Sequence, residues 1–275
     1  MAGDGLALHG EVLGEGPPVV LCHGITATRR YVLHGSGGLV RKGFRQIAYD
    51  ARAHGESDPA PDGGGYTYPA LAGDLESVVA QEVGEGTLVV AGHSMGAHTA
   101  VAYALAHPER IAGLVVIGPV FTGPPSEETT DYWDGLAHAL EQDGVEGFVG
   151  YLDSQGIDPD WREVVLRITR ERISIHHHPE ALAVALSEVP RSLPFESMDE
   201  LEFLDVPALV VASHDSADPG HPYSVAEAYA QKLPNARLTS EAEGESPLAW
   251  QGGRLAREIA GFCAGTDVEA RFGTI

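Results

Sequence analysis

Short apolar runs alternate with longer amphipathic segments along both ends of the chain. Three of these runs are almost wholly apolar, which is typical of strands buried on both faces of a parallel sheet. They cover residues 19–22, 88–91 and 113–117, and residues 45–49 predict a further strand. A looser alternation over residues 6–13 predicts an edge strand, residues 28–42 predict a helix weakened by glycines, and the apolar spacing over 68–83 predicts a helix. The alternation of strands and helices predicts an α/β fold with a doubly wound, mostly parallel sheet.

The alternation stops in the middle of the chain. Residues 122–204 contain no strand-like run, and prolines divide them into expected helices at 130–142, 145–152, 161–175 and 179–189. Strand and helix signals then resume at 207–212, 223–233, 237–240 and 249–263. We therefore expect a core formed by residues 1–121 and 205–275, with an inserted helical cap at 122–204 and a lightly packed tail after residue 265.

The composition limits the classes of function. Lys and Arg total 17 against 40 Asp and Glu, a formal net charge of −23. Nucleic acids and anionic membranes need a positive face, so we expect neither as a partner. The chain has no apolar run of membrane-spanning length and no visible secretory signal, and its two cysteines are far apart in sequence. We expect a cytoplasmic protein with no metal, no cofactor and a small-molecule substrate; the sequence does not predict the oligomeric state.

One stretch, residues 87–106, carries the clearest chemical signal. A buried run at 88–91 leads into Gly92-His93-Ser94-Met95-Gly96, and a helix-like pattern rich in alanine follows. A strand, a serine flanked by glycines and a helix in direct succession match the nucleophile elbow G-x-S-x-G. Such a turn presents the serine hydroxyl beside free N–H groups at the helix N-terminus.

Four motifs in this order resemble the α/β-hydrolase fold family, in its lid-bearing serine hydrolase branch. They are His23-Gly24 after an apolar run, the stretch from Asp50 to Ser57, the elbow around Ser94, and His107-Pro108 before the next strand. The second motif has Ala53 where the family usually has glycine. The resemblance covers nearly the whole chain outside the expected cap.

The resemblance implies roles for individual residues. Ser94 would be the nucleophile, and the backbone N–H groups of Met95 and Ile25 would form the oxyanion hole. The catalytic acid would follow the strand at 207–212, where two candidates occur. Asp215 lies nearer to the strand end and is the first choice, whereas Asp218 has the usual spacing to a following proline, Pro222.

The family's C-terminal histidine is missing from its usual place. The corresponding stretch, 240–250, contains Glu243, Glu245 and Ser246, and no histidine follows His221. A serine needs a neighbouring base to become a good nucleophile, and the base is left open. The candidates are the run His176-His177-His178, in which His178 is the residue we retain, together with His221 and His98, or Glu245 or Glu243 if burial raises the carboxyl pKa.

Two functions are compatible with these observations. The first is hydrolysis of a small carboxylic ester or lactone through an acyl-enzyme on Ser94. The alternative is a catalytically degraded or repurposed protein of this fold that binds a small molecule or catalyses a non-hydrolytic reaction. An epoxide hydrolase or dehalogenase would need Asp at position 94. Aromatic residues of the expected cap either line an apolar substrate pocket or simply pack the cap; they are Tyr132, Trp133, Phe148, Tyr151 and Trp161.

Overall fold

A seven-stranded sheet runs through the protein, with strand order β1-β3-β2-β4-β5-β6-β7. The computed structural model describes residues 5–214, 218–242 and 244–273. The strands are β1 (Gly10–Leu13), β2 (Pro18–Cys22), β3 (Arg45–Tyr49), β4 (Leu88–His93), β5 (Ile111–Ile117), β6 (Ala208–Val211) and β7 (Ala236–Thr239). Strand β1 pairs antiparallel with β3, and the other pairings are parallel. The predicted doubly wound sheet is confirmed.

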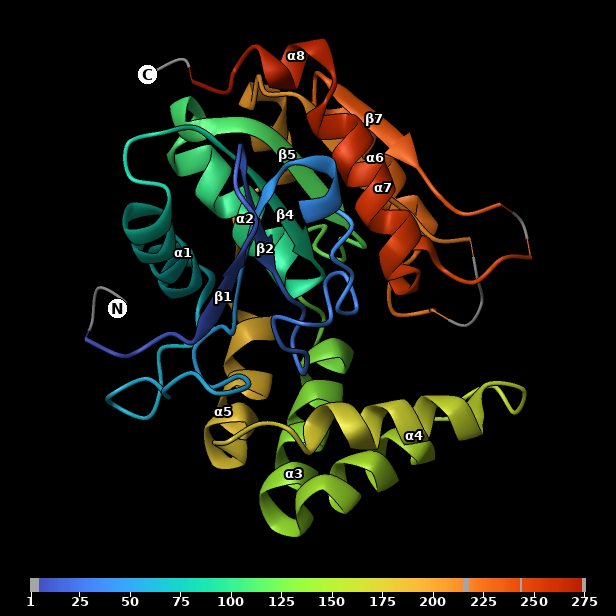
Figure 1. Ribbon diagram of the computed structural model, residues 1–275. Helices are drawn as coiled ribbons and strands as arrows, with labels where there is room; N and C mark the ends of the chain where they lie inside the picture. The colour runs from blue at the N-terminus through green and yellow to red at the C-terminus, as the bar shows by residue number, and fades with distance from the viewer. Residues whose placement is uncertain (1–4, 215–217, 243, 274–275) are drawn as a thin grey trace.

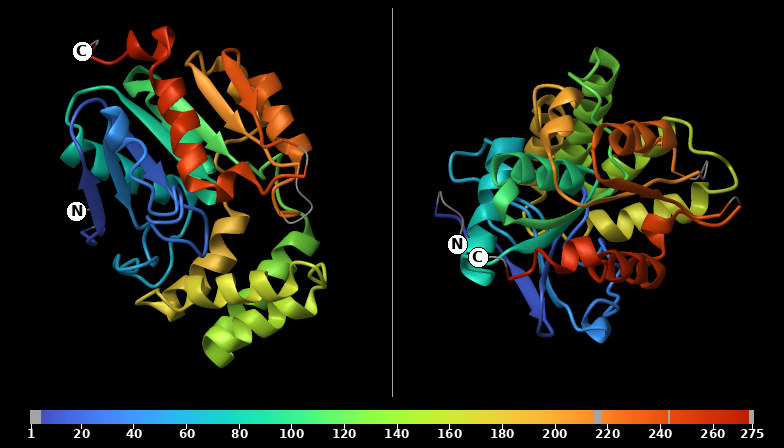
Figure 2. Two further views of the ribbon diagram at one scale, coloured as in Figure 1. Left: turned by 45° about the vertical axis from the view of Figure 1, so that its right-hand side comes forward. Right: turned by 90° about the horizontal axis from the view of Figure 1, so that it is seen from above.

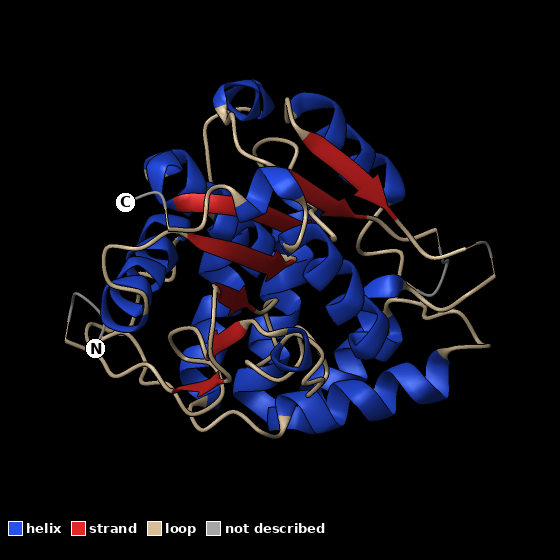
Figure 3. Ribbon diagram, turned by 45° about the horizontal axis from the view of Figure 1, so that its top comes forward, coloured by secondary structure: helices blue, strands red, loops and turns tan. Residues whose placement is uncertain are grey.

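Helices cover both faces of this sheet (Figure 3). Successive strand residues point to opposite faces, so Val20 and Val90 join one apolar cluster while Val19 and Val89 join the other. The first cluster includes residues of α1 (Tyr68–Glu82), α2 (Met95–Ala106) and α6 (Tyr223–Lys232). The second includes α7 (Gly252–Cys263), and Val268 of the short helix α8 (Thr266–Glu269). The near-continuous apolar sequence of the central strands follows from this two-sided burial.

The segment between β5 and β6 forms a helical layer of its own below the sheet (Figures 1 and 2). It contains α3 (Glu127–Ser154), α4 (Arg162–Ile173) and α5 (Pro179–Glu188), followed by short 3₁₀ turns at Val189–Arg191 and Met198–Phe203. These three helices, here called the helical insertion, share an apolar cluster in which Phe148, Ile173 and Leu182 are buried. Because the parallel strands end on the side that faces this layer (Figure 1), residues that follow the strands lie between the sheet and the insertion.

Two local predictions were wrong, and a third was confirmed. Residues 28–42 form turns with one short 3₁₀ helix at Val40–Lys42, since His34 and Gly35 adopt positive φ angles that end any helix. The helices expected at 130–142 and 145–152 are both present: they share the label α3 and are separated by non-helical backbone at Gly144, whose φ is 62° and ψ −148°. The tail is not lightly packed throughout, because Val268 is buried in the core.

Candidate active site

Ser94 lies in the turn between β4 and α2, with φ 53° and ψ −116°. A positive φ is uncommon for a residue with a side chain and indicates local strain. Neither of the glycines that flank Ser94 can be replaced by a residue with a side chain. A Cβ on Gly92 would lie 2.0 Å from the carbonyl oxygen of Gly96, and one on Gly96 would lie 2.1 Å from that of Cys22. The two glycines of the G-x-S-x-G motif are therefore required by close backbone approach, and Ser94 sits in a strained strand-to-helix turn.

The loop after β2 packs directly against this serine. A Cβ on Gly24 would lie 3.3 Å from Cβ of Ser94, so the backbone of the loop touches the elbow. Within the described residues, the N–H of the next residue, Ile25, has no hydrogen-bond acceptor. Met95 is the first residue of α2, and N–H groups at a helix start have no intrahelical acceptor. The N–H groups of Ile25 and Met95, the two predicted for an oxyanion hole, are therefore not used in the backbone hydrogen bonds of the described residues.

Two buried histidines hold this loop in place. Nε2 of His23 accepts from the N–H of Ala51 at 2.9 Å, while its Nδ1 lies 2.8 Å from the carbonyl oxygen of Gly24. Nδ1 of His176 accepts from the N–H of Gly55 at 2.8 Å, and its Nε2 lies 3.1 Å from the carbonyl oxygen of Thr26. Burial lowers the pKa of His176 to about 4. His176 is thus a neutral link between the insertion and the loop after β2, with both ring nitrogens occupied.

The loop after β6 contributes a carboxylate and an imidazole that contact each other. Nδ1 of His221 lies 2.7 Å from Oδ1 of Asp218, and both side chains are largely buried. Burial raises the pKa of Asp218, but the His221 hydrogen bond and the neighbouring His221, His93 and Arg172 outweigh it, so the pKa is lowered. The carboxylate is therefore held ionised. Asp215, the first choice from the sequence, lies outside the described residues.

The ring of His221 lies against the segments that flank Ser94. Its centroid is 4.9 Å from that of His93, the residue before the serine. A Cβ on Gly118 would lie 3.2 Å from Cδ2 of His221, and Gly118 follows the residue whose carbonyl accepts from the Ser94 N–H at 2.9 Å. In the described part of the chain no hydrogen bond joins Oγ of Ser94 to His221 or to another base. The structure thus brings a His–Asp pair to the elbow without a direct contact to the hydroxyl.

The other candidate histidines have different roles. His98 is buried in α2, where Nδ1 contacts the Tyr68 hydroxyl at 2.9 Å and Nε2 accepts two backbone N–H groups at 3.0 and 3.1 Å. His177 is exposed. His178 immediately precedes α5, and its Nδ1 lies 3.6 Å from Oε1 of Glu180. Neither its position nor its partner directs His178 to Ser94.

The glutamates after β7 also have other partners. Glu245 is exposed and forms an ion pair with Arg254, whose hydrogen bond lowers the carboxyl pKa. A general base near neutral pH needs the opposite shift, so the structure gives Glu245 no support as the base. Glu243 lies outside the described residues. The buried Glu241 accepts from the Leu248 N–H at 2.9 Å and the Ser213 hydroxyl at 3.1 Å, which joins the loops after β6 and β7.

The helical insertion holds a residue that the sequence motifs missed. Arg172 near the end of α4 has a buried Nε with no hydrogen-bond partner. It lies within electrostatic reach of Asp218 and His93. The only sequence signal is its spacing, because Arg172 follows the buried Thr169 by three residues and so shares the buried face of the helix.

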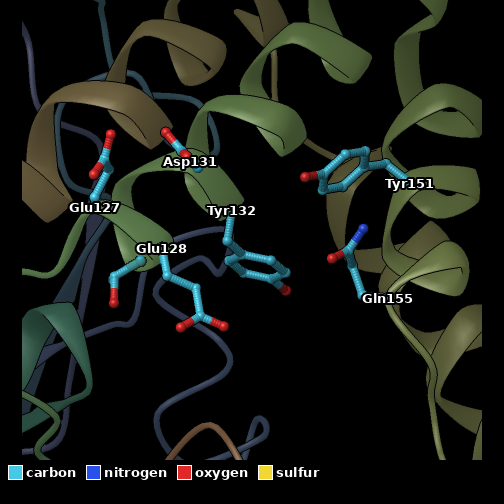
Figure 4. A pocket seen from close by; sticks show the side chains of 7 residues that line it. Glu127, Glu128, Asp131, Tyr132, Tyr151 and Gln155 are labelled. Atoms are coloured by element: carbon cyan, nitrogen blue, oxygen red, sulfur yellow. The ribbon is translucent and has the colours of Figure 1, made fainter.

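The insertion aromatics mostly pack within their own layer. Phe148 is buried in its apolar cluster, and Tyr132, Trp133 and Tyr151 pack against that cluster. Trp161 precedes the first residue of α4. A hollow of about 660 Å³ lies between the two ends of α3 (Figure 4), and it is lined by Glu127, Glu128, Thr129, Asp131, Tyr132, Tyr151 and Gln155. Its carboxylates make it acidic, and Ser94 is not among its lining residues.

No group of three or more His, Cys, Asp or Glu side chains within residues 5–214, 218–242 and 244–273 is arranged to hold a metal ion. No helix there combines the length and the apolar character that crossing a bilayer requires.

Known proteins match this chain in sequence and in structure. The family described as alpha/beta hydrolase fold matches residues 17–251. An sn-1-specific diacylglycerol lipase of Mus musculus, ABHD11, is 37% identical over 113 residues, which are 40% of this chain and 36% of the mouse protein. Epoxide hydrolase B of Mycobacterium tuberculosis is 36% identical over 109 residues, covering 40% of this chain and 30% of that protein. The matched region therefore spans about a third of the length of these relatives.

A solved structure matches over nearly the full length. It is a malate-bound thermophilic esterase from Thermogutta terrifontis, with a TM-score of 0.76 and 26% identity. The alignment covers 94% of this chain and 93% of the esterase. Together with the family match over residues 17–251, this agreement supports a hydrolase. The chain belongs to the alpha/beta hydrolase fold family.

Proposed function

We propose that the protein hydrolyses a small carboxylic ester or lactone through an acyl-enzyme on Ser94. His221 acts as the base, and Asp218 orients it. The observation that carries the proposal is the Asp218–His221 hydrogen bond of 2.7 Å on a ring packed beside His93, next to the elbow. Acid and base then come from one loop, which accounts for the missing histidine after β7.

The chemistry follows from the groups present. With Nδ1–H of His221 donated to Asp218, Nε2 is free to take the Ser94 hydroxyl proton. Oγ of Ser94 bonds to the carbonyl carbon, and the oxyanion is stabilised by the N–H groups of Ile25 and Met95. The tetrahedral adduct expels the alcohol oxygen, which takes the proton from His221. Water, deprotonated by the same imidazole, then releases the carboxylic acid and restores Ser94.

Formation of an acyl-enzyme is the first test. Wild type mixed with 4-nitrophenyl acetate should release a burst of nitrophenolate stoichiometric with the enzyme, and a fluorophosphonate should label Ser94. Ser94→Ala should abolish both. His221→Gln and Asp218→Asn should lower kcat by roughly 10³-fold or more, as expected when a triad member is removed. Glu245→Gln, a matched change on an exposed carboxylate, should leave kcat unchanged.

One observation favours the alternative, a fold that binds a small molecule without hydrolysing it. In the described residues Oγ of Ser94 makes no hydrogen bond to a base. This alternative predicts no burst of nitrophenolate and no fluorophosphonate labelling of Ser94 in wild type. If His221→Gln retained the wild-type kcat, His221 would not be the base even though hydrolysis occurs.

A further inference from the structure

Arg172 is unlike the other arginines of α4. The others each face a carboxylate, in the pairs Arg162–Asp153, Arg167–Glu171 and Arg170–Glu146. Across the described chain, Arg172 has no ion pair, and its Nε is a buried donor without an acceptor. In a chain with 40 acidic side chains and 17 basic ones, carboxylates are available in excess. Among the described residues, Arg172 therefore has no ion pair because of where it lies in the fold, and not because the chain has too few carboxylates.

The surroundings of Arg172 place it between the insertion and the catalytic edge of the sheet. It lies within electrostatic reach of Tyr132 on α3, Tyr31 in the segment after β2, and Asp218. His93, beside the nucleophile, also lies within its reach. Three of these groups, Tyr31, His93 and Asp218, belong to segments at the edge of the sheet that carries Ser94. The guanidinium therefore lies between the insertion and that edge.

No described group of the protein satisfies this cation. Asp218 is already hydrogen-bonded to His221, and no ion pair joins Asp218 to Arg172 within the salt-bridge distance of 4.0 Å. His93 cannot neutralise it, and Nε2 of His93 is itself buried without a partner. Arg172 as a whole is half-buried, but its Nε–H is buried, and a buried donor without an acceptor is costly. Such a group is stabilised when an anion enters.

We propose that Arg172 binds a carboxylate of the substrate, so that the ester or lactone attacked by Ser94 carries a free carboxylate group. This inference rests on the proposed function, and it names the substrate class. The planar fork of guanidinium N–H donors matches both oxygens of a carboxylate. The acyl or alcohol part of the substrate then spans from Ser94 to Arg172, with its reactive carbonyl at one end and its anion at the other.

Paired esters of equal chain length test the assignment. Monomethyl succinate, glutarate and adipate are compared with methyl butanoate, pentanoate and hexanoate, using pH-stat titration to obtain kcat/KM. Wild type should prefer at least one monoester over its neutral counterpart. Arg172→Gln should lower that anionic-to-neutral ratio by roughly ten- to hundredfold, as expected for a lost hydrogen bond to a charged group. Arg172→Lys should retain part of the preference.

Arg170→Gln is the matched control, since Arg170 lies on the same helix but faces the exposed Glu146. Its ratio should equal that of wild type. Equal kcat/KM for anionic and neutral esters in wild type, or an unchanged ratio in Arg172→Gln, overturns the assignment while leaving ester hydrolysis intact. If wild type hydrolyses no ester, the proposed function fails instead.

A binding measurement distinguishes a failure of the Arg172 anion site from a failure of the proposed ester hydrolysis. Calorimetry of the Ser94→Ala protein with monomethyl adipate and methyl hexanoate reports recognition without turnover. Tighter binding of the monoester, lost on adding Arg172→Gln, supports the anion site even in a protein that does not hydrolyse esters. If the Ser94→Ala protein binds both compounds equally or binds neither, and wild type hydrolyses neither, the anion site at Arg172 is overturned.

Discussion

Acid should destabilise this protein through His98, a buried histidine on α2 four residues after Ser94. The side chain is 1% exposed. Its Nε2 accepts the N–H groups of Val120 and Phe121 at 3.0 and 3.1 Å. Its Nδ1–H can then donate to the Tyr68 hydroxyl at 2.9 Å. A proton on Nε2 would oppose two backbone donors, so the folded state holds the ring neutral.

The cost of acid can be calculated from the pKa. Burial lowers the pKa of His98 to about 3, from an ordinary value of 6.5. Between these two pKa values His98 is protonated in the unfolded chain but neutral in the folded chain. The free energy of unfolding therefore falls as pH drops below about 6.5 and continues to fall until about pH 3. Because pH 5 lies about 1.5 pH units below the ordinary pKa of 6.5, the free energy of unfolding at pH 5 should be roughly 2 kcal/mol lower than at neutral pH from this residue alone. His176, with a pKa of about 4, adds a similar amount, and total stabilities are typically about 5–15 kcal/mol.

Urea denaturation of wild type and His98→Gln at pH 7.5 and 5.0 measures this contribution. His98→Gln should be less stable than wild type at pH 7.5, because its hydrogen bonds are altered. The loss of unfolding free energy between the two pH values should nevertheless be about 2 kcal/mol smaller than in wild type. His138→Gln, a change at an exposed histidine, should leave the pH dependence as in wild type. An equal pH dependence in wild type and His98→Gln would refute the reasoning.

Three further substitutions test the framework of the site. Gly96→Ala places a methyl group 2.1 Å from a backbone carbonyl oxygen at the end of β2. It should lower the free energy of unfolding, measured by thermal denaturation, by about 1–3 kcal/mol or more. Gly261→Ala, where a Cβ meets nothing within 4 Å, should not lower it. Arg52→Met breaks the buried pair with Asp74, joined by two hydrogen bonds of 2.7 Å, and should lower the urea-derived stability by about 3–5 kcal/mol; a loss under about 1 kcal/mol would contradict the burial argument. Glu241→Gln turns one of its acceptor oxygens into a donor and should cost about 1–3 kcal/mol, which an unchanged melting temperature would exclude.

Several features of the site could be read from the sequence because they depend on local geometry. The elbow around Ser94 needs small residues at fixed spacing, and the short apolar runs predict strands buried on both faces. Ala53 also proved informative, since its φ of 64° is a conformation that favours glycine. The helix expected over 28–42 failed for a local reason as well, because His34 and Gly35 take up positive φ angles.

The sequence could not show which histidine lies beside the elbow, because that position depends on how separate loops meet. A histidine three residues after an aspartate is an ordinary turn pattern, and the sequence ranked Asp215 above Asp218. Only the packing of the loop after β6 against β4 and β5 brings His221 to the elbow. Arg172 is a clearer case, as it lies far from Ser94 in the chain and belongs to a different layer.

The sequence by itself therefore determined the fold and the position of the strained serine, since these follow from chain-local sterics and from the period of apolar residues. The tertiary structure decided which titratable groups surround the serine. Contacts such as Asp218–His221 beside His93, or an unpaired Arg172 above the sheet edge, depend on the relative placement of loops and layers. Pattern and spacing carry no information about that placement, because each of these side chains would be equally acceptable on a solvated surface.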